Sequence, residues 1–315
     1  MRIIFMGTPD FSTGTLKALY DAGHEVVLAV TQPDKPAGRG KELKSPPVKV
    51  LAKELGIPVY QPEKVRDQEA LDTLRAQNAD IIVVVAFGQI LPREVLEVTP
   101  YGCVNVHASL LPAWRGAAPI QWSLIAGDQV TGVTTMQMDE GLDTGAILLK
   151  EEIPIADDET GGSLFDKLAE AGAALCVRTL KGLEEGSIEP IPQGETTTPY
   201  AKMLNKKMGR IDWTLSAREI ERLIRGLSPW PGAYTFRAGT MLKIKKAAFP
   251  GKEDQADAPE PGLMTRGKNG NLLVQTGDGL LAVKELQPAG KRAMTADEYL
   301  RGKPLKPGEK LDTDL

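Results

Sequence analysis

Residues 80–86 read DIIVVVA, in which one Asp is followed by an uninterrupted run of apolar and mostly β-branched residues. A strand inside a parallel sheet is covered on both faces, so it shows a continuous apolar run and not an alternating one. Residues 2–6 (RIIFM) and 25–30 (EVVLAV) are also typical of buried strands, and a segment with helical spacing separates them. This alternation of strand and helix predicts a doubly wound parallel sheet with right-handed crossovers.

The other elements of the first half follow the same order. We expect a short strand at 58–60, a strand at 103–107, and helices at 12–22, 48–55, 68–77 and 163–183. The first turn, residues 7–11 (GTPDF), lacks the second and third glycines of the dinucleotide-binding fingerprint. The sequence therefore predicts a Rossmann-like α/β topology that does not bind NAD.

A change of composition marks a second domain. Residues 187–200 are rich in Pro, Thr and Gly, which is typical of a linker. Ser216 and Glu219 then form a capping-box pattern before a helix. The rest shows short strand patterns separated by turns such as GKNGN and TGDG, which predict a small OB-like β-barrel. We expect a catalytic domain at 1–188, a linker at 189–207 and a C-terminal domain at 208–315.

Composition excludes several classes of protein. The longest apolar run, residues 81–87, is far shorter than the ~20 residues that a transmembrane helix needs. The 2 cysteines, Cys103 and Cys176, cannot build a disulfide framework or a structural zinc site, and the 2 histidines argue against a His-rich metal centre. We expect a cytoplasmic protein that uses no metal and contacts no membrane.

The net charge of −4 hides an uneven distribution along the chain. Residues 206–315 contain 20 Lys and Arg against 14 Asp and Glu, whereas residues 1–205 contain 18 against 28. A basic C-terminal third indicates a surface that faces a polyanion, if the motifs agree.

The strongest chemical signal lies in residues 103–122, CVNVHASLLPAWRGAAPIQW. On a strand, the period of two directs Asn105 and His107 to the same face. An amide donor beside an imidazole suits a site where negative charge develops on an oxygen. A carboxylate from the glycine-flanked turn at 139–145 (DEGLDTG) could orient His107 and keep it protonated. Cys103 shares the polar face, but nothing in the sequence activates its thiol, and we interpret it as structural.

The string Asn105-Val-His107-Ala-Ser109-Leu-Leu-Pro112, followed by Arg115-Gly-Ala-Ala-Pro119 and Asp143, resembles the folate-dependent formyltransferases. The resemblance covers nearly the whole chain. It implies that Asn105, His107 and Asp143 are catalytic and that 10-formyltetrahydrofolate donates the formyl group as co-substrate. It also implies that two loops hold the folate, through Phe87, Gly88, Gln89, Ile90, Leu91, Ser109, Leu110, Leu111 and Pro112.

Two basic segments bear on the acceptor of the formyl group. Residues 32–49 form a Pro- and Gly-rich loop that contains the stretch Gly38-Arg39-Gly40-Lys41. The loop comes just after a strand and therefore lies beside the ligand crevice of the sheet. Residues 206–210 (KKMGR) lie at the expected domain junction. The resemblance implies that the first loop contacts the acceptor stem of a tRNA. We expect initiator methionyl-tRNA to bind a monomer through Arg39, Lys41, Lys206, Lys207 and Arg210.

Three other interpretations remain open from the sequence. A formyltransferase could act on an amino sugar or on glycinamide ribonucleotide, although neither acceptor requires basic segments. A formyl-folate hydrolase would use water in place of the amine. A tRNA-binding module could have lost catalysis, but the Asn105, His107 and Asp143 triplet argues against this last interpretation.

Overall fold

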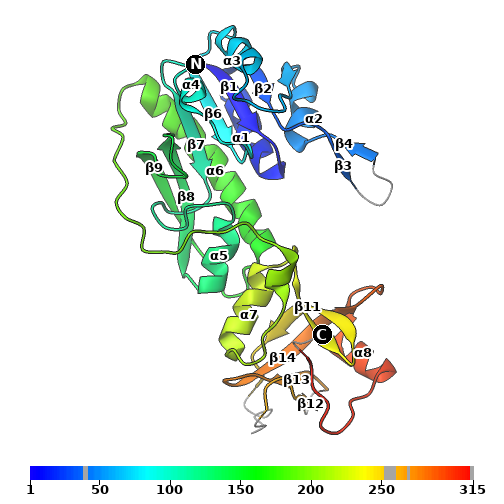
Figure 1. Ribbon diagram of the computed structural model, residues 1–315. Helices are drawn as coiled ribbons and strands as arrows, with labels where there is room; N and C mark the ends of the chain where they lie inside the picture. Colours follow the sequence, from blue (N-terminus) through cyan, green and yellow to red (C-terminus); the bar gives the residue numbers. More distant parts are fainter. Residues whose placement is uncertain (38–41, 252–259, 268–269, 313–315) are drawn as a thin grey trace. The chain divides into compact units, whose positions relative to one another are not determined.

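The computed structural model describes residues 1–37, 42–251, 260–267 and 270–312 (Figure 1). These residues form two compact units. The first comprises residues 1–119, 130–154 and 165–201, and the second comprises 120–129, 155–164 and 202–315. The chain therefore passes between the units more than once, because two short internal segments belong to the second unit.

A seven-stranded sheet forms the centre of the first unit, in the order β5-β2-β1-β6-β7-β8-β9. Its strands are β1 (Arg2–Gly7), β2 (Glu25–Val30), β5 (Val59–Tyr60), β6 (Ile81–Val85), β7 (Cys103–His107), β8 (Val130–Gln137) and β9 (Ile147–Pro154). The strands from β5 to β7 pair in parallel, whereas β8 pairs antiparallel to both β7 and β9. The strand order reverses between β1 and β6, where the carboxyl ends of parallel strands leave a crevice for ligands.

Helices cover both faces of this sheet (Figure 1). Helices α1 (Asp10–Asp21) and α6 (Gly161–Glu184) meet through an edge-to-face contact of Phe11 with Phe165, whose ring centres lie 5.2 Å apart. On the opposite face, α3 (Gln68–Arg75) and α4 (Arg93–Leu96) share one apolar core with Ile4, Val30 and Val84 of the sheet. Helices on both faces of a largely parallel sheet confirm the predicted doubly wound fold.

Four further elements belong to the region between β2 and β8. A hairpin of β3 (Lys35–Ala37) and β4 (Glu42–Lys44) precedes α2 (Pro47–Glu54), and α5 (Pro119–Ala126) follows β7. Arg39 and Lys41, both expected to bind tRNA, lie outside the described residues.

The second unit contains an antiparallel sheet in the order β10-β11-β14-β13-β12, with β15 paired to β14. The elements are η1 (Lys206–Gly209), α7 (Ala217–Gly226), β10 (Ala233–Arg237), β11 (Thr240–Ala248), β12 (Met264–Arg266), β13 (Leu272–Gln275), β14 (Leu280–Pro288), β15 (Met294–Thr295) and α8 (Ala296–Gly302). Lys310 bridges Leu263 and Asp312 bridges Phe236, so the last described residues join the two edges of the sheet. An antiparallel sheet joined in this way agrees with the expected barrel-like domain.

The predicted capping box of α7 is confirmed, because the Ser216 hydroxyl accepts from the Glu219 N–H and the Glu219 carboxylate accepts from the Ser216 N–H. The apolar side of α7 places Ile220 and Ile224 in the core of this unit, together with the buried Trp213. No helix in the described part of the chain is both long and apolar enough to cross a membrane.

Candidate active site

Strand β7 presents different chemistry on its two faces. Val106 faces α6, where a Cβ atom added to Gly172 would lie only 2.9 Å from the Val106 side chain. Asn105 and His107 therefore face away from α6. The antiparallel ladder pairs Asn105 with Met136 and His107 with Thr134 of β8. Residues directly opposite one another in a ladder share a face, so these four side chains lie on one side of the sheet.

His107 is buried, with only 6% of its surface exposed, and each ring nitrogen faces a protein oxygen. Its Nε2 atom lies 3.1 Å from the carbonyl oxygen of Trp114, and its Nδ1 atom lies 3.8 Å from Oδ1 of Asp143. Because a carbonyl oxygen can only accept, the first contact requires a proton on Nε2. Nδ1 therefore faces the carboxylate, at an ion-pair distance slightly too long for a hydrogen bond.

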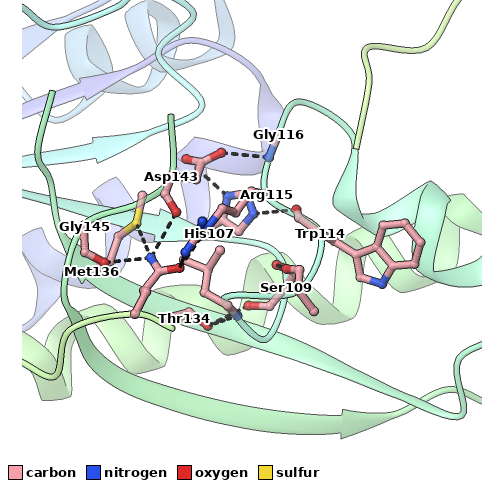
Figure 2. A network of polar contacts seen from close by, with 12 residues as sticks. His107, Ser109, Trp114, Arg115, Gly116, Thr134, Met136, Asp143 and Gly145 are labelled. Carbon is pink, nitrogen blue, oxygen red and sulfur yellow. Dashed lines mark hydrogen bonds and ion pairs between the residues drawn. The ribbon is translucent and has the colours of Figure 1, made fainter. Parts of the chain in front are cut away.

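Asp143 lies in the loop between β8 and β9, which folds over the same face of the sheet (Figure 2). Its Oδ2 atom accepts a hydrogen bond of 2.9 Å from the backbone N–H of Gly116. Asp143 and Trp114 have φ angles of +57° and +56°, a conformation that costs a non-glycine residue about 1 kcal/mol or more. The loops therefore hold both partners of His107 in conformations that need external support.

Asn105 is mostly covered, with 9% of its surface exposed. Its amide is not among the buried side-chain groups that lack a hydrogen-bond partner in the described part of the chain. The amide lies two residues before His107 on the same face of β7. It is therefore a donor and acceptor on the face that carries His107.

Side chains of β8 and β9 form hydrogen bonds with the backbone of the loop at 109–112. The Thr134 hydroxyl donates to the Ser109 carbonyl oxygen at 2.6 Å and accepts from the Leu111 N–H at 3.1 Å. The Lys150 ammonium group also donates to the Leu111 carbonyl oxygen. The Ser109 and Leu111 side chains are fully buried and shape the loop, whereas Leu110 and Pro112 are partly exposed. A ligand would therefore meet Leu110, Pro112 and the loop backbone.

The second expected folate loop follows β6, the neighbour of β7 in the sheet. Phe87 and Leu91 are buried, whereas Gly88 is exposed, Gln89 is partly exposed and Ile90 is 75% exposed. The Thr8 hydroxyl, just after β1, donates to the Phe87 carbonyl oxygen at 2.9 Å. None of the backbone N–H groups from Phe87 to Leu91 reaches an acceptor in the described part of the chain. The loop thus offers backbone donors at the carboxyl end of β6.

The basic residues differ in what surrounds them. Lys206 and Lys207 are exposed on η1, and neither forms an ion pair with a described residue. Arg210, which follows η1, is also exposed. In the loop at 32–49, however, the Lys49 ammonium group contacts both Asp34 carboxylate oxygens at 2.8 Å. Hydrogen bonds from Gln61 and Lys49 lower the pKa of Asp34 to about 2, so the charge of Lys49 is already balanced.

Several residues that shape this site were not predicted from the sequence. Gln193 and Thr198 belong to the segment with linker composition, yet the Gln193 amide contacts Asp143 and Arg115, and Thr198 accepts from the Trp114 N–H at 2.7 Å. No local pattern marks these contacts. Thr134, in contrast, could have been identified as the residue opposite His107 if the pairing register of β7 and β8 had been known.

The Cys103 thiol was the other reactive group considered from the sequence. Burial raises the pKa of the Cys103 thiol to about 12, and its sulfur lies in the core beside Val95 and Leu96. The structural interpretation of Cys103 is therefore supported, because a nucleophilic cysteine needs a thiolate. The described residues contain no group of three or more His, Cys, Asp or Glu side chains that could hold a metal ion.

Two family matches cover most of the chain. Residues 1–180 match the formyl transferase family, and residues 203–304 match the formyl transferase C-terminal domain. A protein of Agathobacter rectalis named methionyl-tRNA formyltransferase is 55% identical over 303 residues, which is 96% of each chain. A protein of Lachnospira eligens with the same name is 53% identical over 311 residues, 98% of each chain.

Solved structures agree with the fold at low sequence identity. WlaRD, described as a sugar 3N-formyl transferase, is 18% identical with a TM-score of 0.67, and the match covers 93% of this chain and 99% of WlaRD. HypX from Aquifex aeolicus, solved with tetrahydrofolic acid, is 18% identical with a TM-score of 0.62. That match covers 99% of this chain but only 50% of HypX. On its sequence matches and its fold, this chain belongs to the formyl transferase family.

Proposed function

We propose that this chain is a methionyl-tRNA formyltransferase. It transfers the formyl group of 10-formyltetrahydrofolate to the α-amino group of initiator methionyl-tRNA, and the product serves translation initiation in the cytoplasm. The observation that carries the reaction is the Asn105 amide on the same face of β7 as His107, which lies opposite Asp143. The acceptor is supported by relatives of this name that are 55% and 53% identical over nearly the full length of both chains.

Asn105, His107 and Asp143 are the proposed catalytic residues. When the neutral amine attacks the formyl carbon, negative charge develops on the formyl oxygen. The Asn105 amide donates to that oxygen, and the imidazole of His107 stabilises the same charge. The Asp143 carboxylate, 3.8 Å from Nδ1 of His107, orients the ring and accepts the proton that the amine releases. The bond between the formyl carbon and N10 of the folate then breaks, and N10 of the departing tetrahydrofolate takes up the proton that the amine has lost.

The two loops that end β6 and β7 suit a folate, which supplies an already activated formyl group. The backbone N–H groups from Phe87 to Leu91, unpaired among the described residues, match the acceptor atoms of a pterin ring. Ile90, Leu110 and Pro112 offer apolar surface. Phe87, Leu91, Ser109 and Leu111 contribute by shaping these loops, because their side chains are buried.

The tRNA is proposed to contact Lys206, Lys207 and Arg210, together with Arg39 and Lys41. The exposed lysines of η1 have no carboxylate partner among the described residues, so phosphates could approach them directly. We also propose that the protein is a monomer, with a catalytic domain at 1–188, a linker at 189–207 and a tRNA-binding domain at 208–315.

A competition assay tests the proposal. The protein is incubated with 10-formyltetrahydrofolate and with methionyl-tRNA, free methionine and an amino sugar as competing acceptors. We expect formylation of methionyl-tRNA alone. Formylation of the amino sugar would show that the chain is a formyltransferase with a different acceptor. Release of formate without any formylated acceptor would indicate a hydrolase. Arg39→Ala should lower kcat/KM for methionyl-tRNA more than it weakens tRNA binding, since positioning affects turnover more than affinity.

A further inference from the structure

The segment 191–201, which we call the strap, is attached to the first unit at both ends. Ile191 forms an antiparallel bridge with Ile147 at the start of β9, with two backbone hydrogen bonds of 2.8 Å. Ala201 donates its N–H to the Arg115 carbonyl oxygen at 2.8 Å and accepts from Ala117 at 2.8 Å. Despite its linker composition, the strap lies against the loops that carry the candidate catalytic residues.

Gln193 is the residue of the strap that bonds the Asp143 loop. Its Nε2 group donates to the carbonyl oxygens of Asp143 at 3.0 Å and Gly145 at 2.7 Å. Its Oε1 atom accepts from Nε and Nη2 of Arg115, at 3.0 Å and 2.8 Å. One amide thus joins the loop after β7, which contains Arg115, to the loop between β8 and β9, which contains Asp143.

These bonds bear on the geometry of the His107–Asp143 pair. Asp143 has a φ angle of +57°, so the loop needs bonds from outside to remain in this conformation. One such bond comes from Gly116 to the carboxylate, and the other comes from Gln193 to the carbonyl oxygen of the same residue. Without Gln193, the carboxylate would be held only through its own side chain.

Gln193 also determines what Arg115 contacts. The guanidinium group binds the Gln193 amide oxygen and the Gly194 carbonyl oxygen, and it has no ion pair among the described residues. Arg115 follows Trp114 and precedes Gly116, the two residues whose backbones bind His107 and Asp143. A neutral partner keeps Arg115 in place without adding a second carboxylate beside Asp143.

We propose that Gln193 is a positioning residue for the formyl transfer, which holds the Asp143 carboxylate opposite His107 by binding the Asp143 carbonyl oxygen. This inference rests on the proposed function, since it assigns Gln193 to the same reaction. Gln193 acts through Asp143 and touches neither the amine nor the formyl group. Its contribution should therefore appear in kcat, and it should disappear when the Asp143 carboxylate is absent.

Two substitutions separate positioning from general stabilisation. Gln193→Ala removes all the contacts of the amide. Gln193→Glu has the same shape and still accepts from Arg115, but it cannot donate to Asp143 and Gly145. Ile191→Ala is the matched control, because this side chain is 60% exposed and the strap contacts β9 there through backbone atoms.

The experiment measures kcat, tRNA affinity and thermal unfolding for each variant, alone and combined with Asp143→Ala. We expect kcat to fall ~10- to 10²-fold in Gln193→Ala and Gln193→Glu, the range for a misplaced catalytic group, while tRNA affinity is unchanged. Ile191→Ala should retain full kcat. In the Asp143→Ala background, Gln193→Ala should lower kcat less than twofold further.

Two results would overturn the inference. One is a kcat of Gln193→Glu equal to that of the parent, because this variant lacks the donor. The other is an equal loss from Gln193→Ala with and without the Asp143 carboxylate, which would indicate a structural role only. If the parent enzyme fails to formylate methionyl-tRNA but formylates another amine, the proposed acceptor fails and the Gln193 comparison is made with that amine.

Discussion

Thr134 lies directly opposite His107 in the ladder between β7 and β8, and its hydroxyl holds the loop that follows His107. The hydroxyl bonds two residues of that loop, the Ser109 carbonyl oxygen and the Leu111 N–H. One pair of strands therefore positions both the imidazole and the loop that we propose for the folate. The buried Thr134 hydroxyl, with its hydrogen bonds satisfied, thus links β8 to the loop at 109–112.

Thr134→Val tests this coupling. The variant keeps the shape of the side chain but leaves the Leu111 N–H and the Ser109 carbonyl oxygen without partners, which costs about 1–3 kcal/mol of unfolding free energy. We expect the KM for 10-formyltetrahydrofolate to rise several-fold. Thr135→Val is the matched control, since Thr135 is equally buried but bonds Thr179 on the α6 side. If both variants change the folate KM equally, the loop does not depend on Thr134.

Asn105→Ala and His107→Ala should each lower kcat by ~10²–10³-fold, the usual loss for an oxyanion donor or an acid–base group. Binding of tRNA should be nearly unchanged, because neither side chain lies on a basic surface. Steady-state kinetics at saturating substrates, beside equilibrium tRNA binding, measure both quantities. A variant that retains the turnover of the parent would remove that residue from the catalytic set.

Lys206 and Lys207 should act as phosphate anchors. Replacing both with Ala should weaken tRNA binding and reduce the slope of log affinity against log salt by roughly one to two units, since about one counterion is released per contact. The affinity for folate should not change. Lys17→Ala serves as control, because Lys17 is half exposed on α1 and already pairs with Asp21. A salt slope equal to that of the parent would contradict the assignment.

The second unit contains a buried ion pair that predicts a dependence of stability on pH. The Arg237 guanidinium binds both Glu309 carboxylate oxygens, at 2.9 Å and 2.7 Å, and the Arg237 side chain is 6% exposed. This contact lowers the pKa of Glu309 from its ordinary value of 4.5 to about 2. A carboxyl whose pKa is lowered on folding stabilises the protein above its ordinary pKa and loses that effect as the pH falls.

Glu309→Gln should therefore lower the free energy of unfolding by roughly 2 kcal/mol at pH 7, the range for a hydrogen bond to a charged group. The difference from the parent should narrow between about pH 4.5 and about pH 2, as Glu309 becomes protonated in both the folded and unfolded states. Urea unfolding of both proteins across this pH range makes the comparison. A difference that stays constant with pH would show that the ion pair does not contribute.

Local patterns in the sequence were sufficient for the parallel strands of the sheet and for part of the site, whereas the antiparallel strands β8 and β9 were not predicted. The apolar run at 80–86 predicted a strand buried on both faces, and β6 (Ile81–Val85) is fully buried. The period of two in β7 predicted that Asn105 and His107 share a face. The capping box at Ser216 and Glu219 predicted the start of α7. Each of these features depends on residues close together in the chain, where backbone geometry sets the spacing.

The tertiary structure decided how distant groups meet at that face. Local patterns left open which carboxylate of the 139–145 turn meets His107, and only the family resemblance named Asp143. In the structure Asp139 bonds Gly141 and Thr144 within the turn, whereas Asp143 faces His107. Thr134 reaches the loop after His107 through the register of two antiparallel strands, and Gln193 reaches Asp143 from a segment of linker composition. The sequence by itself determined the parallel strands and the helices α1, α2, α3, α6 and α7, because local periodicity specifies them. Strand register and the path of a Pro- and Gly-rich segment depend instead on the packing of the whole unit, which only the folded chain defines.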